Sequence, residues 1–335
     1  MLMSDTPATI RQTTMKAIVH ERYGRPDVLE LREVPVPVPD EGQVLVRVHA
    51  SSVNPVEWYG VTGPVFARPG NGLRRPTFTG VGADVAGTVE AVGKEVERLA
   101  PGDQVYGVAA GAWAELACAR PERLGPKPAN LSFAEAAAVP IAAVTALQAL
   151  RDRGRVERGQ KVLINGASGG VGTFAVQLAK SLGADVTAVC STGNVQLVES
   201  LGADRVVDYT QDDFTRLPER FDVMLDIAGS RSFFELRRVL TPEATVVLVG
   251  GRMTYRGLGP IPHLLGTRLK AIGRSQEAIS FLAKVTPEDL AVLRELFEAG
   301  TIRPVIDREY RLEDAVEALA YLGEGHARGK VVVAV

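Results

Sequence analysis

Cysteine is scarce in this chain, because only Cys118 and Cys190 occur among its 335 residues. Two cysteines exclude a framework of disulfide bonds and indicate a reducing compartment. We expect both to be small buried side chains rather than nucleophiles. Histidine is scarce too, and the spacing of the four histidines fits no metal site, so they are interpreted as surface or structural residues: His20, His49, His263 and His326.

A strong net charge and a long hydrophobic run are also absent. The formal net charge is −2 at pH 7, which gives no reason to expect a nucleic-acid partner. The most apolar stretch, Ala134–Leu150, is interrupted by a glutamate, a proline and two further polar residues, which argues against a membrane span. The first 14 residues are polar and lack the apolar centre of a signal peptide. We therefore expect a disordered extension there and a cytoplasmic protein.

The chain does have length and two contrasting patterns. At 335 residues it exceeds one ordinary hydrophobic core, so two domains are expected. The N-terminal third carries short runs of β-forming residues between turn signals, without long helices, which predicts a barrel-like β domain. The expected strands are 17–19, 29–34, 44–50, 87–92, 104–108 and 113–119.

From about residue 132 the pattern changes to alternating strands and helices. Ser132 followed by Glu135 is a capping-box sequence that predicts a helix start, and two helical stretches follow around Pro140. The alternation then predicts a doubly wound parallel sheet with helices on both faces. Its expected elements are 161–165, 171–182, 185–190, 194–201, 205–207, 221–226, 231–240 and 244–249, with Thr267–Gly273 as a further strand at the edge.

The last part of the chain has no hydrophobic core of its own. Its pattern predicts a helix over 287–299, a strand over 305–310, a helix over 312–322 and a closing strand over 330–335. We therefore expect this part to fold back onto the β domain. The predicted division is a disordered extension (1–14), a β domain made of 15–131 and 286–335, and a nucleotide-binding domain (132–285).

The run Val162–Lys180 is typical of a dinucleotide-binding unit. It reads as a buried strand, a glycine-rich turn and an amphipathic helix, in that order. Glycines let the backbone approach a pyrophosphate, and the helix N-terminus offers free N–H groups to it. Ala167 stands where many such folds have their first glycine. The prediction therefore depends on Gly169 and Gly172, for close phosphate approach and for packing of the helix on the strand.

The end of the next strand bears on the choice of cofactor. It reads Ser191-Thr192-Gly193-Asn194 and contains no carboxylate. An acidic residue there would bind the ribose 2′-hydroxyl of NAD and repel a 2′-phosphate, whereas hydroxyl groups and a helix N-terminus accept the phosphate. This favours NADP(H), although no basic residue follows Gly193 until Arg205.

Several motifs in order resemble a known family. They are Met15-Lys16-Ala17, Val53-Asn54-Pro55-Val56-Glu57-Trp58, Gly82-Ala83-Asp84-Val85-Ala86-Gly87-Thr88-Val89, Pro101-Gly102-Asp103-Gln104-Val105, the glycine turn, Ser200-Leu201-Gly202-Ala203-Asp204 and Gly329-Lys330-Val331-Val332. From Met15 to Val335 the chain resembles the medium-chain dehydrogenase/reductase superfamily, in its zinc-free quinone oxidoreductase (zeta-crystallin-like) branch. The resemblance implies an α/β protein with a GroES-like β-barrel domain, a Rossmann domain and an active site in the cleft between them.

The expected cofactor site combines this resemblance with the ends of the strands. The loops after the fourth and fifth strands lie at carboxyl ends, where ligands bind in open α/β sheets, and they are expected to flank the nicotinamide ribose. Tyr209 matches a family position beside the adenine ribose phosphate, and a tyrosine that only packs a loop is the equal alternative. The expected cofactor-binding residues are Ala167, Ser168, Gly169, Gly170, Val171, Gly172, Ser191, Thr192, Asn194, Tyr209, Ala228, Val249, Gly250 and Gly251.

The resemblance also bears on metal binding. Zinc-dependent members of the superfamily have a zinc-binding Gly-His-Glu where this chain has Gly82-Ala83-Asp84. Ala83 has no ligand atom, and Asn54 stands near the position of their first zinc cysteine, where an amide poorly replaces a thiolate. The cysteine cluster of their structural zinc is missing as well. We therefore expect an enzyme without metal, which disfavours alcohol oxidation.

A nicotinamide without a metal best reduces an acceptor that is already polarised, such as a quinone or an α,β-unsaturated carbonyl. Hydride adds to the β carbon, and the carbonyl oxygen gains negative charge that needs a hydrogen-bond donor. Asn54 and Tyr59 are the expected catalytic residues, with Tyr59 either a proton donor or, equally, an apolar wall of the pocket. Asp84 is expected to accept hydrogen bonds from backbone near the cleft. Glu57 fits a surface carboxylate as well as it fits a member of the site.

The favoured function is an NADPH-dependent reductase of quinones or enones, with a small-molecule substrate and no nucleic-acid or membrane partner. Two alternatives remain: a zinc-independent carbonyl or alcohol dehydrogenase, and a cofactor-binding structural or redox-sensing protein without turnover. The resemblance also implies a homodimer, joined at the sheet edge along Thr267–Ser275. The basic residues of that segment equally suit the protection of a monomer's edge.

Overall fold

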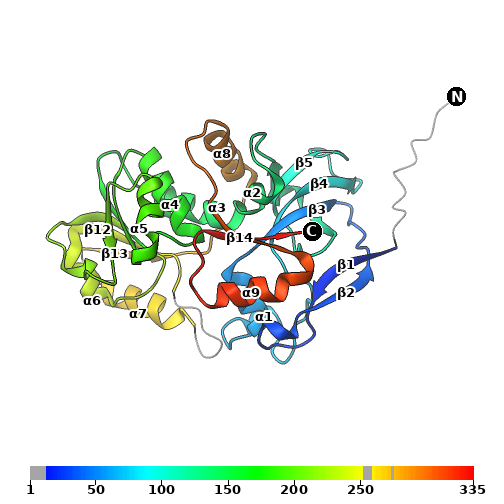
Figure 1. Ribbon diagram of the computed structural model, residues 1–335, viewed down its shortest axis with the longest axis horizontal. Helices are drawn as coiled ribbons and strands as arrows, with labels where there is room; N and C mark the ends of the chain where they lie inside the picture. The colour runs from blue at the N-terminus through cyan, green and yellow to red at the C-terminus, as the bar shows by residue number, and fades with distance from the viewer. Residues whose placement is uncertain (1–12, 252–258, 273–274) are drawn as a thin grey trace.

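The computed structural model describes residues 13–251, 259–272 and 275–335. Two lobes lie side by side along the longest axis, one built on a parallel sheet and the other rich in antiparallel strands (Figure 1). Residues 1–12 of the expected disordered extension lie outside the described residues. Thr14 already belongs to the first strand.

The antiparallel lobe is organised around the long strand β3. It pairs with β4 on one side and with β15 and β6 on the other, and the sheet runs in the order β14-β15-β3-β4-β5-β7. The predicted strands of the N-terminal third are confirmed, and β7 is an addition to them. The strands are β1 (Thr14–Val19), β2 (Glu30–Pro35), β3 (Val44–Val53), β4 (Asp84–Val92), β5 (Gln104–Val108), β6 (Leu116–Ala119) and β7 (Leu124–Pro126).

The second sheet is the predicted doubly wound sheet. Its strands are parallel and follow the order β10-β9-β8-β11-β12-β13, so the chain reverses direction across the sheet between β8 and β11. This is the 3-2-1-4-5-6 order of dinucleotide-binding sheets, and the crevice at such a reversal is where ligands bind. The strands are β8 (Lys161–Asn165), β9 (Asp185–Cys190), β10 (Arg205–Asp208), β11 (Phe221–Asp226), β12 (Leu240–Leu248) and β13 (Glu277–Ser280).

Helices connect these strands and close the lobes. Ser132 caps α2 as predicted, because its hydroxyl accepts the N–H of Glu135 at 3.2 Å and the Glu135 carboxylate accepts the N–H of Ser132 at 2.8 Å. The α-helices are α1 (Pro55–Thr62), α2 (Phe133–Ala137), α3 (Pro140–Gln148), α4 (Gly170–Ser181), α5 (Val195–Ser200), α6 (Phe233–Leu236), α7 (Ile261–Ala271), α8 (Pro287–Glu298) and α9 (Ala315–Gly323). A π-helical segment, Ala149–Arg153, extends α3, and short 3₁₀ helices cover Pro26–Val28, Arg68–Gly70, Pro121–Arg123, Thr192–Asn194, Phe214–Arg216, Arg237–Val239 and Leu312–Asp314.

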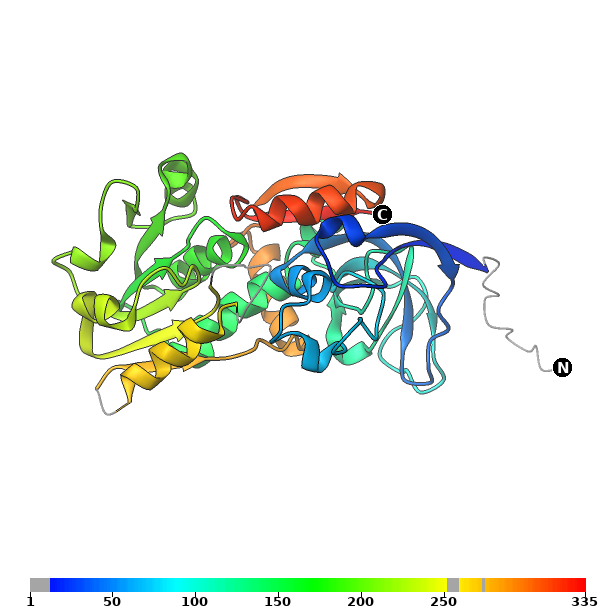
Figure 2. The same cartoon turned by 90° about the horizontal axis from the view of Figure 1, so that it is seen from below.

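The C-terminal part returns to the antiparallel lobe, as expected from its lack of a core. β15 (Lys330–Ala334) pairs antiparallel with β3, and β14 (Ile306–Arg311) pairs parallel with β15. Figure 2 shows α9 and β14 along one side of the molecule, over the region where the two lobes meet. The start of β15 therefore lies between the two sheets, close to the glycine turn.

The prediction of an edge strand over Thr267–Gly273 is wrong. Helix α7 extends to Ala271, and the strand at this edge is β13, Glu277–Ser280; residues 273 and 274 lie outside the described residues. Thr267 and Ala271 are the buried members of α7, and their spacing of four is helical. A run this short, with mixed apolar and basic residues, does not distinguish the helical period from the strand period.

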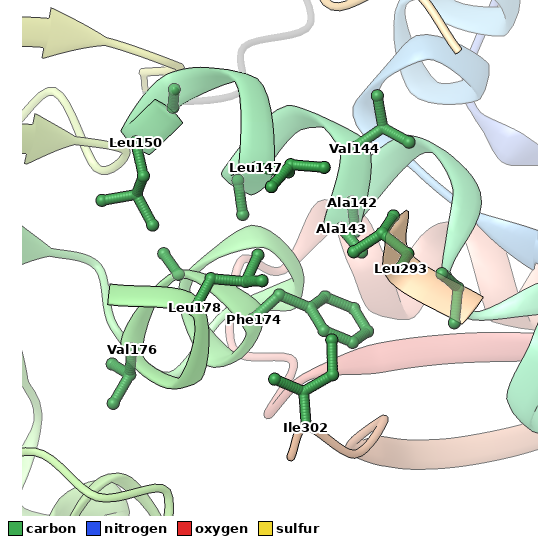
Figure 3. Close-up of a cluster of buried hydrophobic side chains, with 14 of the residues drawn as sticks. Ala142, Ala143, Val144, Leu147, Leu150, Phe174, Val176, Leu178, Leu293 and Ile302 are labelled. Atoms are coloured by element: carbon green, nitrogen blue, oxygen red, sulfur yellow. The ribbon is translucent and has the colours of Figure 1, made fainter. Parts of the chain in front are cut away.

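The two lobes share one hydrophobic cluster. Figure 3 shows Leu147 and Leu150 of α3 and its extension above Phe174 and Leu178 of α4, with Leu293 of α8 beside them. The same cluster includes alanines of β3 and β4 in the other lobe. Helix α2 packs on β3 and β4 of one lobe, and helix α3 packs on α4 of the other, which holds the lobes together and fixes the strand ends that face the junction.

Candidate cofactor and active site

The glycine turn joins β8 to α4 at the reversal of the sheet. Gly166 has a φ of +94°, a conformation that favours glycine, and the N–H groups of Gly166 and Ala167 both donate to the carbonyl oxygen of Val189 in β9. The tight turn is therefore made by Gly166, one residue before Ala167. Ala167 itself is fully buried.

Gly169 and Gly172 differ in what surrounds them. A Cβ atom at Gly172 would lie 2.1 Å from the carbonyl oxygen of Gly166, so no side chain fits there and the helix packs directly on the turn. A Cβ at Gly169 would meet only the Gly166 oxygen, at 3.8 Å. Gly169 caps α4, whose first N–H groups have no acceptor within the helix. The open space at Gly169 and the free donors beside it fit a pyrophosphate.

The polar residues after β9 gather at the far end of this turn. The Asn194 side-chain amide donates to the hydroxyls of Ser168 and Ser191, both at 3.1 Å. Its oxygen Oδ1 is buried and has no hydrogen-bond partner among the described residues. Both serine hydroxyls keep their own protons for a ligand. This pattern suits the ribose of a dinucleotide. The buried Asn194 oxygen needs a hydrogen-bond donor from a ligand, and the two serine hydroxyls can each donate one hydrogen bond to that ligand.

The structure also brings a carboxylate to this end of the site. The Thr192 hydroxyl donates to Asp208 at 2.6 Å, and hydrogen bonds from Thr192 and Thr210 lower the pKa of the Asp208 carboxyl. The end of β9 itself has no acidic residue. Asp208 is the last residue of β10 and reaches Thr192 only through the pairing of β9 with β10, so no local signal in the sequence pointed to it. Tyr209 beside it is 55% exposed.

The expected nicotinamide side is formed by the turns after β11 and β12. A Cβ at Gly229 would lie 2.8 Å from the Cα of Gly251, so these two turns approach each other at the carboxyl ends of their strands. Val249 and Gly250 donate backbone N–H groups to the carbonyl oxygen of Asp226, and Ala228 donates to that of Asn165. The structure therefore places Ala228, Val249, Gly250 and Gly251 together beside the glycine turn.

A buried carboxylate organises these turns and was not foreseen. Asp226 accepts hydrogen bonds from the Asn165 side chain at 2.8 Å, from the Gly229 N–H at 3.0 Å and from His263 Nε2 at 2.8 Å. His263 stands 37 positions away in the chain, so spacing gave no signal for the pair. Its partner is a carboxylate in the interior, which supports the expectation of a structural histidine.

A second buried network lies at the start of α1. Asp84 is fully buried and accepts from the Ile141 N–H at 2.9 Å, from Ser52 Oγ at 2.6 Å and from Asn54 Nδ2 at 2.9 Å. Ile141 lies in the first turn of α3, so the carboxylate satisfies an otherwise unpaired helix donor. The expectation that Asp84 accepts hydrogen bonds from backbone is confirmed.

Lys330 supplies the positive charge of this network. Its ammonium Nζ lies 2.5 Å from Asn54 Oδ1, 3.5 Å from Asp84 Oδ2 and 3.3 Å from the carbonyl oxygen of Val53. Lys330 is only 3% exposed, and burial lowers its pKa while Asp84 and Glu57 act in the opposite direction. In the sequence, Lys330 was part of a family motif and the start of a predicted strand, and no role in the site was predicted for it.

The same lysine connects the network to the glycine turn. Its Cδ lies 3.0 Å from the position of a Cβ at Gly170. The N–H of Gly329 donates to the carbonyl oxygen of Ser168 at 2.8 Å, and Gly169 and Gly329 form an isolated parallel bridge. The Lys330 side chain therefore lies between Asn54 and the first turn of α4. An active site at the junction of two domains requires such closeness.

Glu57 is not a surface carboxylate, which corrects that alternative. It is 5% exposed and accepts the N–H of Asn54 at 2.7 Å, which closes the first turn of α1. Burial and the nearby Asp84 carboxylate raise its pKa to about 8. This favours the protonated form of Glu57 at neutral pH, beside the ion pair of Asp84 and Lys330.

Tyr59 lies one turn further along α1 and is half-buried. Its ring meets Phe66 edge to face at 5.0 Å between centroids, and Phe66 in turn packs against Gly259, at the start of α7. Burial raises the pKa of the Tyr59 hydroxyl, which stays protonated. Within the described ranges this hydroxyl has no hydrogen-bond partner, so it is free to donate to a ligand. Trp58 is buried in the core.

The donor set does not fit a zinc ion. No group of three or more histidine, cysteine, aspartate or glutamate side chains among the described residues could hold a metal. Next to Ala83, the side chains of Asn54 and Asp84 bind each other and the ammonium of Lys330. Burial raises the pKa of both cysteine thiols to about 11, which disfavours thiolate ligands and nucleophiles.

Comparisons with known proteins agree with this fold. Residues 40–149 match the alcohol dehydrogenase GroES-like domain, and residues 201–333 match a domain described as zinc-binding dehydrogenase. The chain is 36% identical to 2-methylene-furan-3-one reductase of Solanum lycopersicum, over 95% of this chain and 79% of that protein. It is 33% identical to the NADPH-dependent alkenal/one oxidoreductase, chloroplastic, of Arabidopsis thaliana, again over 95% and 79%.

A solved structure gives the same result. The quinone oxidoreductase from Coxiella burnetii has a TM-score of 0.84 and 31% identity, with 96% of this chain and 99% of that chain covered. The fold and site define a two-domain oxidoreductase with a Rossmann-type sheet and a GroES-like domain. The chain belongs to the medium-chain dehydrogenase/reductase family, as its motifs predicted.

Two further expectations concern the surroundings of the protein. Across the described ranges, no helix has both the length and the apolar character that crossing a membrane requires. The alkenal/one relative is named as chloroplastic. The cytoplasmic location expected for this chain therefore stays a prediction.

Proposed function

We propose that this protein is an NADPH-dependent reductase of quinones or α,β-unsaturated carbonyl compounds that works without a metal. The observation that carries the proposal is the network of Lys330, Asn54 and Asp84, because an ammonium lies among the side chains where zinc-dependent members place ligands. The names of the relatives support the substrate class, since they include an enone reductase, an alkenal/one reductase and a quinone oxidoreductase.

Different residues of the chain would bind different parts of the cofactor. The first turn of α4, from Gly170, would hold the pyrophosphate, and Ser168, Ser191 and Asn194 would hold the adenosine ribose. The turns at Ala228 and at 249–251 would flank the nicotinamide ribose. When bound, the nicotinamide supplies the hydride for the β carbon of the acceptor. Placement of the acceptor within about 3–3.5 Å of the hydride donor is the main task of the cleft.

Tyr59 would act on the acceptor oxygen. Its hydroxyl is protonated and has no partner in the described part of the chain, so it can donate to the oxygen as negative charge develops there. Asn54 has one Nδ2 proton left after its bond to Asp84, and its Oδ1 is taken by Lys330. Asn54 therefore contributes a fixed wall and one further donor to the same site.

The proposal predicts that Tyr59→Phe lowers turnover and leaves the affinity for the cofactor unchanged. We expect kcat with a simple enone or quinone to fall about 10- to 100-fold, towards the lower end of the usual effect of a positioned proton donor. The dissociation constant for NADPH is expected to stay within twofold. The measurements are NADPH oxidation by absorbance and NADPH binding by fluorescence titration.

Tyr310→Phe is the matched control, because it removes a phenolic hydroxyl from β14, which is not among the elements assigned to the site. It is expected to keep the activity of the unchanged protein. Oxidation of NADPH by neither a quinone nor an enone, despite tight binding, would contradict the reductase and support a sensor or structural protein. Unchanged turnover in Tyr59→Phe would show that Tyr59 is an apolar wall.

We also propose that two copies of the chain pair through the edge of β13 that has no neighbouring strand among the described residues; β12 is bonded to its other edge. Three apolar side chains are exposed beside this edge. They are Leu265 (54%) and Leu269 (66%) of α7, and Ile272 (74%), the residue that follows the helix. Their spacing of four and three residues places them on one face. An exposed apolar stripe beside an open strand suits a second copy. Sedimentation velocity is expected to show a dimer that Leu269→Glu dissociates, and a monomeric unchanged protein would refute the pairing.

A further inference from the structure

We propose that Arg328, in the turn between α9 and β15, binds the 2′-phosphate of the cofactor and makes the protein prefer NADPH. This inference rests on the proposed function. Gly193 follows β9 at its carboxyl end, where dinucleotide-binding sheets hold the adenosine ribose. The guanidinium nitrogen Nη2 of Arg328 lies 3.3 Å from the position of a Cβ at Gly193. The arginine therefore reaches the ribose end of the site from a distant part of the chain.

The local residues leave this end short of positive charge. The proton of the Thr192 hydroxyl is directed to Asp208, so it is not available to a phosphate oxygen. Asp208 itself adds a negative charge that opposes phosphate binding. Arg205, the first basic residue after Gly193 in the sequence, is paired with Glu219 at 2.6 Å. A doubly charged 2′-phosphate needs a cation here, and Arg328 supplies one.

The backbone holds Arg328 in place, while its side chain is left for a ligand. The Arg328 N–H donates to Asp307 Oδ2 at 2.9 Å, and Tyr321 donates to the same oxygen at 2.6 Å. The next N–H, of Gly329, donates to the carbonyl oxygen of Ser168 in the glycine turn. The guanidinium has no hydrogen-bond or ion-pair partner in the described part of the chain. A fixed backbone with a free guanidinium suits bidentate binding of phosphate.

The arrangement explains how a chain without a basic residue beside Gly193 can still select a phosphorylated cofactor. A 2′-hydroxyl, as in NADH, gains little from a guanidinium, whereas a phosphate gains charge-assisted hydrogen bonds. Removal of Arg328 should therefore affect cofactors with the phosphate and spare those without it. A role in folding alone would affect both cofactors equally.

The test measures binding by the full-length protein and its Arg328→Gln and Arg328→Lys variants. NADPH and NADH are titrated by fluorescence, and 2′,5′-ADP and 5′-AMP are titrated by calorimetry, because these two fragments differ only in the phosphate. Arg328→Gln is expected to weaken NADPH and 2′,5′-ADP about 10- to 100-fold, the usual range for charged hydrogen bonds. NADH and 5′-AMP are expected to change less than twofold, and Arg328→Lys is expected to be intermediate.

Arg303→Gln is the matched control. It removes the same charge near the end of α5, where Arg303 lies by the Ser200 hydroxyl, and it is expected to change neither cofactor's affinity. Equal weakening of NADPH and NADH by Arg328→Gln, or unchanged binding of 2′,5′-ADP, would overturn the inference. If the unchanged protein bound neither NADPH nor NADH, the proposed function would fail and this inference with it. Tight NADPH binding that Arg328→Gln leaves intact would refute only the role of Arg328.

Discussion

Replacement of Lys330 by methionine is expected to lower the free energy of unfolding by about 3–5 kcal/mol, the usual cost of removing one partner from a buried ion pair. The change leaves the Asp84 carboxylate in the interior without its cation, and it leaves Asn54 Oδ1 without its donor. Methionine has a similar length, so little volume is lost. Urea unfolding followed by circular dichroism measures the difference.

The double variant Lys330→Met/Asp84→Asn provides the control for this prediction. With both charges removed, no ion is left unpaired, and we expect the double variant to be more stable than Lys330→Met alone. The coupling between the two positions is expected to lie within about 0.5–3 kcal/mol, as is usual for residues in one network. Additive effects of the two substitutions would show that the ammonium and the carboxylate do not stabilise each other.

Substitution of Gly169 and Gly172 by alanine, one at a time, is expected to separate cofactor binding from folding. Gly169→Ala should keep its stability within about 0.5 kcal/mol, because its φ of −83° is allowed for alanine and the nearest protein atom is 3.8 Å away. Its Cβ would occupy the space proposed for the pyrophosphate, so NADPH affinity should fall more than about 100-fold, or roughly 3 kcal/mol.

Gly172→Ala is expected to behave in the opposite way with respect to stability. Its Cβ would lie 2.1 Å from the Gly166 oxygen, a backbone atom that cannot move aside alone, so the helix must shift. Strain of this kind costs about 1–3 kcal/mol, and the displaced helix should also bind NADPH weakly. Thermal unfolding and fluorescence titration measure the two effects. Full NADPH affinity in Gly169→Ala would show that the cofactor does not bind at this turn.

Local patterns were sufficient for most of the parallel sheet. The strands at 161–165, 185–190 and 221–226 were predicted to the residue, because buried parallel strands are short apolar runs between clear turn signals. The edge of the sheet was predicted wrongly, since Thr267–Ala271 has no clear period. Helix α1 was not predicted as a helix, because it is short and most of its residues after Pro55, among them valine, tyrosine, glycine and threonine, are poor helix formers.

Some features of the candidate site were likewise visible in the local sequence, and others were not. The glycine turn was visible in the sequence, because consecutive residues determine its backbone and the start of α4. The sequence left open whether Glu57 lies on the surface or in the site, and only the tertiary structure shows that it is buried near Asp84 and Lys330, with its pKa raised to about 8. Asp208 was missed because the pairing of β9 with β10, which brings it to Thr192, is not contained in either strand alone.

The sequence by itself determined the two-domain α/β fold, the dinucleotide turn and the family, since each depends on residues close together in the chain. Only the tertiary structure shows which charged side chains meet at the site. Lys330 meets Asn54 across 276 positions and Asp84 across 246 positions, because β15 pairs with β3. Arg328 reaches Gly193 because the start of the same strand docks on the glycine turn. Contacts between such distant side chains follow from strand pairing and shared burial, which no local pattern specifies.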